Sequence, residues 1–173
     1  MSTSSLIRRR WLVTGGAAAI GAGAGLAVWL RSTAEPEGLW SLAFDRPDGT
    51  RLALAELRGA PLLLNFWATW CPPCVREMPA LDRFAKAQAA RGWRVLGLAV
   101  DKAEPVREFL ARTPVSYPIA LAGFAGIELS RTLGNRGGGL PFTVVFDRRG
   151  RVRARHAGEA RAEQLDAWAE GNP

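Results

Sequence analysis

Two cysteines with two residues between them, Cys71 and Cys74, stand where a buried strand gives way to a helix, and the chain has no other cysteine. The apolar run 61–67 predicts the strand, and residues 74–90 predict the helix. Residues three apart on a helix share a face, at a separation that suits a disulfide. The pattern therefore predicts a strand–turn–helix unit whose cysteine pair exchanges between dithiol and disulfide.

The two cysteines are expected to have different roles. Cys71 is predicted to cap the helix, where unpaired N–H groups and the helix dipole lower the pKa of a thiol and make it the nucleophile. Cys74 lies one turn inside and is predicted to be the resolving thiol. Pro72 and Pro73 bring no N–H groups, so the N–H of Cys74 is the main donor left for the thiolate. Weak stabilisation of the thiolate favours the disulfide form, which predicts a reducing pair.

The cysteine pair has two other interpretations: a plain structural disulfide, or half of a metal site. A zinc site takes four ligands from cysteine, histidine or carboxylate. The chain has one histidine, His156, and no second cysteine pair. We therefore favour redox chemistry, expect no metal, and interpret His156 as a surface residue near the end of the last predicted strand.

The first 34 residues are predicted to be a signal sequence or an N-terminal membrane anchor. The basic stretch Arg8-Arg9-Arg10 precedes an uncharged run, 11–30, which is rich in glycine and alanine, and small residues follow up to Ala34. A run of this length is just enough to span a bilayer. The paired arginines also resemble a twin-arginine export signal. The sequence leaves open both cleavage and the export route.

The net charge of +7 is largely a property of this N-terminal segment. Four of the 23 basic residues precede residue 35, which leaves 19 basic against 16 acidic residues in the remainder. No basic stripe interleaved with aromatic residues follows. We therefore expect no nucleic-acid partner.

Residues 35–173 are predicted to form one α/β domain. Residues 39–44 and 51–54 can pair around a turn at 46–49 and make an N-terminal hairpin extension. The remaining predicted elements are strands at 61–67, 94–100, 117–121, 142–147 and 151–156, and helices at 74–90, 104–112, 125–133 and 161–170. Their alternation predicts a mixed central sheet flanked by helices, and the last two strands are expected to form an antiparallel hairpin.

Residues 39–170 resemble the TlpA/ResA-like thiol:disulfide oxidoreductases of the thioredoxin superfamily. The resemblance is carried by the motif 70–74, by Leu140-Pro141 before a strand, and by an insertion between strands 94–100 and 142–147. It implies a thioredoxin fold with a cis proline at Pro141, beside the cysteine pair. It also implies that Trp70, Pro141 and the backbone of Leu140 bind an extended substrate segment.

Glu77 stands where TlpA/ResA-like proteins have an active-site glutamate. The resemblance implies that Glu77 relays protons and tunes the thiols; the alternative is an ordinary solvated carboxylate on the helix face. Thioredoxin has a buried aspartate where this chain has Asn65. An amide cannot take up a proton, so Glu77 is the better candidate for this role.

The implied function is that of a periplasmic enzyme that reduces disulfides of exported client proteins. In such proteins the reductant serves cytochrome c maturation or copper-site assembly, and a membrane thiol carrier donates the electrons. An uncleaved N-terminus would add the inner membrane as a partner. The resemblance implies no cofactor besides the redox-active pair Cys71–Cys74. Two alternatives are a dithiol oxidant and a binding module that handles metal or assists assembly without turnover.

Overall fold

The computed structural model describes residues 35–171, so the predicted targeting segment 1–34 lies outside the described residues. Within residues 35–171, no helix is both long enough and apolar enough to cross a membrane. The strands are β1 (Ala43–Asp45), β2 (Arg51–Ala53), β3 (Leu62–Trp67), β4 (Arg94–Ala99), β5 (Ile119–Leu121), β6 (Phe142–Phe146) and β7 (Val152–Ala157). The α-helices are α2 (Pro72–Gln88), α3 (Ala103–Arg112), α4 (Gly126–Thr132) and α5 (Ala162–Glu170).

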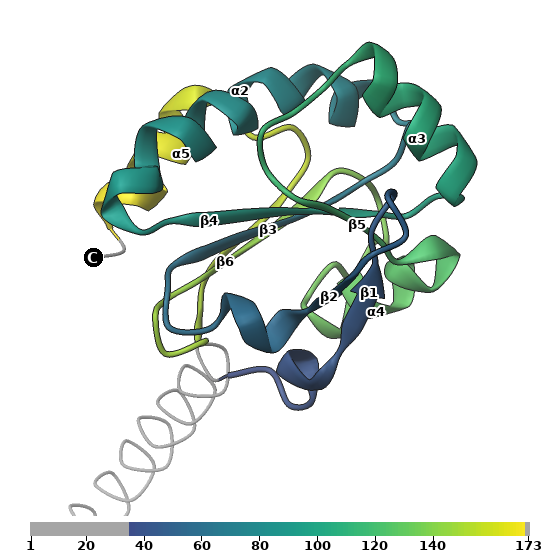
Figure 1. The fold of residues 1–173 in the computed structure, drawn as a ribbon. Coiled ribbons are helices and arrows are strands. Elements are labelled where there is room, and N and C mark those ends of the chain that lie inside the picture. Colours follow the sequence, from purple (N-terminus) through teal and green to yellow (C-terminus); the bar gives the residue numbers. More distant parts are fainter. Residues whose placement is uncertain (1–34, 172–173) are drawn as a thin grey trace, which may run out of the picture. The chain divides into compact units, whose positions relative to one another are not determined.

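The strands form one seven-stranded mixed sheet in the order β2-β1-β5-β4-β3-β6-β7 (Figure 1). β3 is parallel to β4 and antiparallel to β6. All six residues of β3 are buried, which explains why its sequence is an apolar run, interrupted by Asn65 alone, instead of an alternating one. The arrangement confirms the predicted thioredoxin-like fold with a mixed sheet and a C-terminal hairpin.

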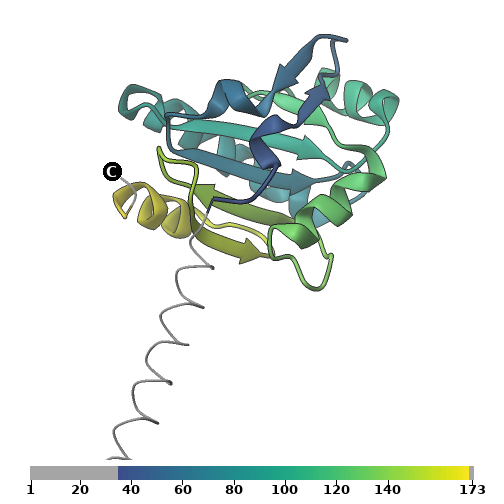
Figure 2. The same cartoon turned by 90° about the horizontal axis from the view of Figure 1, so that it is seen from below.

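Helices cover both faces of the sheet (Figures 1 and 2). Each face has its own core of buried side chains. Side chains of α2, α3 and α5, among them Met78 and Leu165, pack with Trp67 on one face. On the other face Trp40 and Phe66 pack with α4 and with two short 3-10 helices, η1 (Leu39–Ser41) and η2 (Leu54–Leu57). The sheet is therefore a rigid layer from which the loops at its edges project.

The structure corrects two element boundaries. Residues 39–44 were expected to be extended, but Leu39–Ser41 form a 3-10 turn because Trp40 packs edge-on against Phe146, with ring centroids 5.4 Å apart. The helix after the cysteine motif begins at Pro72 instead of residue 74, since proline fits the first turn of a helix.

The carboxyl ends of β3, β4 and β5 meet at one edge of the sheet because these three strands are parallel. β6 runs antiparallel to β3 and begins at the same edge, with Phe142 opposite Phe66. β7 is antiparallel to β6 and ends there. This edge therefore gathers the residues that follow β3, β4 and β7 and those that precede β6.

Candidate active site

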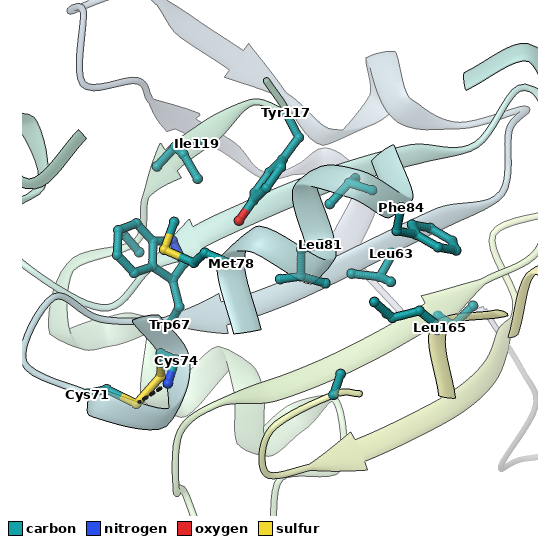
Figure 3. Close-up of a cluster of buried hydrophobic side chains, with 14 of the residues drawn as sticks. Leu63, Trp67, Cys71, Cys74, Met78, Leu81, Phe84, Tyr117, Ile119 and Leu165 are labelled. Carbon is teal, nitrogen blue, oxygen red and sulfur yellow. Dashed lines mark hydrogen bonds between the residues drawn. A yellow bond between two sulfur atoms is a disulfide. The ribbon is translucent and has the colours of Figure 1, made fainter. Parts of the chain in front are cut away.

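Cys71 and Cys74 form a disulfide at the start of α2, with their Cα atoms 5.3 Å apart. Cys71 is the N-cap residue in an extended backbone conformation, and its Sγ accepts a hydrogen bond from the backbone N–H of Cys74 at 3.3 Å (Figure 3). Pro72 and Pro73 occupy the two positions between them and carry no N–H. The N–H of Cys74 is thus the donor that the helix start offers to the Cys71 sulfur, as the sequence predicts.

The two cysteines differ in their accessibility to solvent. Cys71 is 4% exposed and Cys74 is fully buried, while the neighbouring Trp70 is 58% exposed. Trp70 is one of two large apolar side chains that are exposed within residues 35–171. A partner can therefore reach Cys71 more readily than Cys74, over a surface that includes an indole ring.

Asp101 holds the loop that leads from β3 to the cysteines. Its Oδ2 accepts hydrogen bonds from the backbone N–H and the Oγ1 hydroxyl of Thr69, at 3.0 and 2.5 Å. Its Oδ1 accepts a bond from the backbone N–H of Lys102 at 2.7 Å. No motif in the sequence singles out Asp101. The available signal was a carboxylate placed just after a buried strand that runs parallel to β3.

Glu77 lies one turn beyond Cys74 on α2 and is 1% exposed. Its Oε1 accepts a bond from Nδ2 of Asn65 and its Oε2 one from the backbone N–H of Ala160, both at 2.7 Å. Asn65 also donates to Oγ1 of Thr143 at 3.0 Å. The alternative of a solvated carboxylate at Glu77 is therefore wrong.

Burial raises the pKa of Glu77 to about 7, because the charged form loses its hydration. The bonds from Ala160 and Asn65 act in the opposite direction, and the nearby negative charge of Glu159 adds to the rise. The carboxyl can therefore gain and lose a proton near neutral pH, in a position one helical turn from a cysteine.

The peptide bond between Leu140 and Pro141 is cis. The register of β6 on β3 brings Pro141 beside the end of β3, next to the turn that carries Cys71. Leu140 packs against the core cluster that contains both cysteines. The carbonyl of Pro141 accepts a bond from the N–H of Gly158 at 2.9 Å, so the loop after β7 fastens this segment.

The contacts of His156 are with Trp168 and with the loop after β7. His156 lies on β7, its ring meets Trp168 at a centroid distance of 5.8 Å, and its Nε2 is 3.3 Å from the carbonyl oxygen of Glu159. Within residues 35–171, no group of three or more histidine, cysteine or acidic side chains is arranged to hold a metal ion. The chemistry that the site supports is that of the cysteine pair and a buried carboxyl.

Comparison with known proteins agrees with this reading. The family model described as Redoxin matches residues 39–168. The thiol-disulfide oxidoreductase ResA of Bacillus cereus is 30% identical over 122 residues, which are 70% of this chain and 68% of that protein.

Two solved structures have the same fold. A thioredoxin-related protein of Neisseria meningitidis serogroup B has a TM-score of 0.67 and 35% identity over 75% of this chain and 96% of its own. A thiol:disulfide interchange protein of the thioredoxin family from Chlorobium tepidum has a TM-score of 0.67 and 30% identity, over 80% and 97%.

Proposed function

The chain belongs to the Redoxin family and is a thiol–disulfide oxidoreductase, and we propose that it works as a reductant of disulfides in exported client proteins. It needs no cofactor besides the pair Cys71–Cys74. The start of α2 supports the proposal that the pair acts as a reductant. There, two prolines leave a single backbone N–H donor for the Cys71 sulfur. A thiolate with so little stabilisation gives up its electrons readily to form the disulfide.

The reaction runs in two exchange steps. The Cys71 thiolate attacks one sulfur of the client disulfide, and the second client sulfur leaves as a thiolate that takes up a proton. The Cys74 thiol then loses its proton and attacks Cys71, which forms the Cys71–Cys74 disulfide and releases the first client sulfur. Two electrons pass from the protein dithiol to the client, and the client ends with two thiols.

Glu77 is proposed to handle the protons of this exchange. Its carboxyl is buried, one turn from Cys74, and its pKa is raised to about 7. In its protonated form it can supply a proton, and in its ionised form it can accept the one that Cys74 must lose. Asn65 and the N–H of Ala160 hold the carboxyl in place while its charge changes.

Client contact is proposed at the sheet edge around the disulfide. Trp70 offers an exposed ring beside Cys71, and the backbone of Leu140, ahead of the cis Pro141, is placed to pair with an extended client segment. The basic and apolar pattern of residues 1–34 supports a periplasmic location, either anchored in the inner membrane or released. There the clients would be apocytochromes c or copper-site proteins, and a membrane thiol carrier would re-reduce the pair.

The test of the reducing direction is the redox equilibrium of the pair against glutathione. We expect a potential near that of thioredoxin, about −270 mV, and far from that of the oxidant DsbA, about −120 mV. A value at the oxidising end would refute the proposal and favour a dithiol oxidant. Titration of the reduced protein with copper or zinc tests the metal-handling alternative, for which tight binding would be required.

The assignment of the two cysteines is tested by trapping. Cys74→Ser removes the resolving thiol, so a mixed disulfide between Cys71 and the client should accumulate. The matched variant Cys71→Ser should trap nothing. The reverse pattern would show that Cys74 is the attacking thiol.

A further inference from the structure

A groove of about 490 Å³ adjoins the cis-proline segment, between the end of β7 and the loop before β6. Its lining includes Asn135, Arg136, Leu140, Pro141 and Gly158. Leu140 and Pro141 are the residues proposed to contact the client. A client segment that pairs with Leu140 would therefore continue along this groove.

A buried amide gives the wall of the groove its shape. Asn135 is 4% exposed, and its Nδ2 donates to Oγ of Ser130 at 3.0 Å and to the carbonyl oxygen of Gly139 at 2.8 Å. These two bonds hold the turn 135–139 against α4. A Cβ added at Gly137 or Gly139 would meet no atom within 4 Å, so this turn leaves its backbone open to an approaching segment.

The groove is basic. Arg136 is the one charged residue that lines it in the described part of the chain, and no carboxylate of residues 35–171 lines it. The guanidinium of Arg136 is exposed and forms neither a hydrogen bond nor an ion pair with the described residues. A cation left in this state beside the client path is available to an anionic group of the client.

The charged neighbours of the groove are already engaged. Arg131, which lies over Gly138, pairs with Glu128 at 3.4 Å. Glu159, next to Gly158, pairs with Arg76 at 2.9 Å. Arg136 is therefore free to act as the charge that a client meets in the groove.

We propose that the groove selects client segments that carry an acidic side chain near the reactive cysteine, with Arg136 as the residue that determines this preference. The inference rests on the proposed function, since it concerns the clients of the same exchange. Arg136 makes no contact with the reacting sulfurs in this scheme. It changes which client is reduced fastest and leaves the chemistry of the cysteine pair unchanged.

The test compares reduction rates of three synthetic peptides, each closed by one internal disulfide. They differ only in a glutamate, glutamine or lysine two residues from the same cysteine, and the placement is repeated on either side. The reduced protein should act on the glutamate peptide two- to fivefold faster than on the glutamine peptide, a range typical of one exposed ion pair (about 0.5–1 kcal/mol). The lysine peptide should be slowest, and added salt should reduce the differences.

Variants of Arg136 test whether the preference among peptides depends on the charge of this side chain. Arg136→Glu should make the lysine peptide the fastest, and Arg136→Gln should abolish the preference. Arg149→Glu is the matched control, because Arg149 is an exposed arginine in the turn after β6, at the opposite end of that strand from Pro141. This control should keep the preference for glutamate.

Equal rates for the three peptides with the wild-type protein, or an unchanged preference in Arg136→Glu, would overturn the inference. The neutral small disulfide 2-hydroxyethyl disulfide reports on the chemistry alone, and the wild type and the control Arg149→Glu should reduce it at the same rate. Failure of the wild type to reduce it would refute the proposed function itself. Normal reduction of it without discrimination among peptides would refute only the role of the groove.

Discussion

Helix α2 carries two carboxylates that differ in almost every physical respect. Glu77 is buried, receives hydrogen bonds from the neutral groups of Asn65 and Ala160, and has a pKa raised to about 7. Asp82 has a side chain that is 17% exposed. Hydrogen bonds from Lys86 and Ser116 lower its pKa to about 2.

The charge of the hydrogen-bond partner and the access of water therefore decide whether each carboxylate is a fixed charge or a group that titrates near neutral pH. Asp82 has a cation, Lys86, at 2.5 Å, and it ties the helix to the segment before β5 through Ser116. It remains ionised and serves as a fixed structural charge. Both hydrogen-bond donors that Glu77 has among the described residues are neutral, so its burial is only partly offset and its proton is labile near neutral pH.

Of the effects expected from the contrast between Glu77 and Asp82, the largest is the pH dependence of the protein's stability that Glu77 causes. The folded pKa of Glu77 lies above its unfolded value of about 4.5, so the protonated carboxyl stabilises the fold at acidic pH. This contribution is full below pH about 4.5 and is lost as the pH rises to about 7, for a total of about 3 kcal/mol. The free energy of unfolding, measured with urea at several pH values across this range, should fall with rising pH in the wild type. In Glu77→Gln it should lack this fall. The same pH dependence in both proteins would mean that burial does not raise the pKa of Glu77.

The next effect is the cost of removing each carboxyl. Glu77→Ala leaves the buried donors of Asn65 and Ala160 unsatisfied and opens a small cavity, so it should cost about 2–3 kcal/mol at mildly acidic pH. Asp82→Ala should cost less than about 1 kcal/mol, because it removes partly exposed contacts. Unfolding midpoints in urea measure both. Equal losses would break the distinction between the two sites.

A smaller effect is expected on the thiol itself. Glu77→Gln keeps the shape of the side chain and removes its charge, so the nearby Cys71 thiolate forms more easily. The pKa of Cys71 should fall, and the pH profile of disulfide reduction should shift with it. Thiolate absorbance in the reduced protein measures this pKa, with Asp82→Asn as the control that leaves it in place. If both variants behave like the wild type, Glu77 does not tune the pair.

The smallest effect concerns Asp82 and its partner. The folded pKa of Asp82 lies below its ordinary value of 3.8, so its contribution is present above that pH and disappears as the pH falls toward about 2. Lys86→Ala should cost about 0.3–0.5 kcal/mol at neutral pH, as is typical of such pairs on a helix surface. Chemical unfolding at neutral and at strongly acidic pH should show the loss only at neutral pH. A loss that persists at strongly acidic pH would assign it to packing instead of charge.

The local strand–turn–helix unit of the site could be predicted from the sequence. The apolar run of β3, the cap at Cys71 and the prolines of the first helical turn are set by neighbouring residues and their conformational limits, so they could be predicted. The alternation of elements likewise predicted the mixed sheet with helices on both faces. The short 3-10 turn at Leu39–Ser41 could not be predicted, because it depends on the packing of Trp40 against the distant Phe146.

The environment of the reacting groups depends on contacts between residues that are far apart in the chain. The partners of Glu77 come from positions 12 and 83 residues away in the chain, and Asp101 reaches Thr69 across 32 residues. These contacts follow from strand register and from the meeting of loops at one sheet edge, which no local pattern encodes. From its position in a helix alone, a glutamate is expected to be a surface charge. In the folded protein the sheet and the loop after β7 bury Glu77, and the loss of hydration raises its pKa toward neutrality.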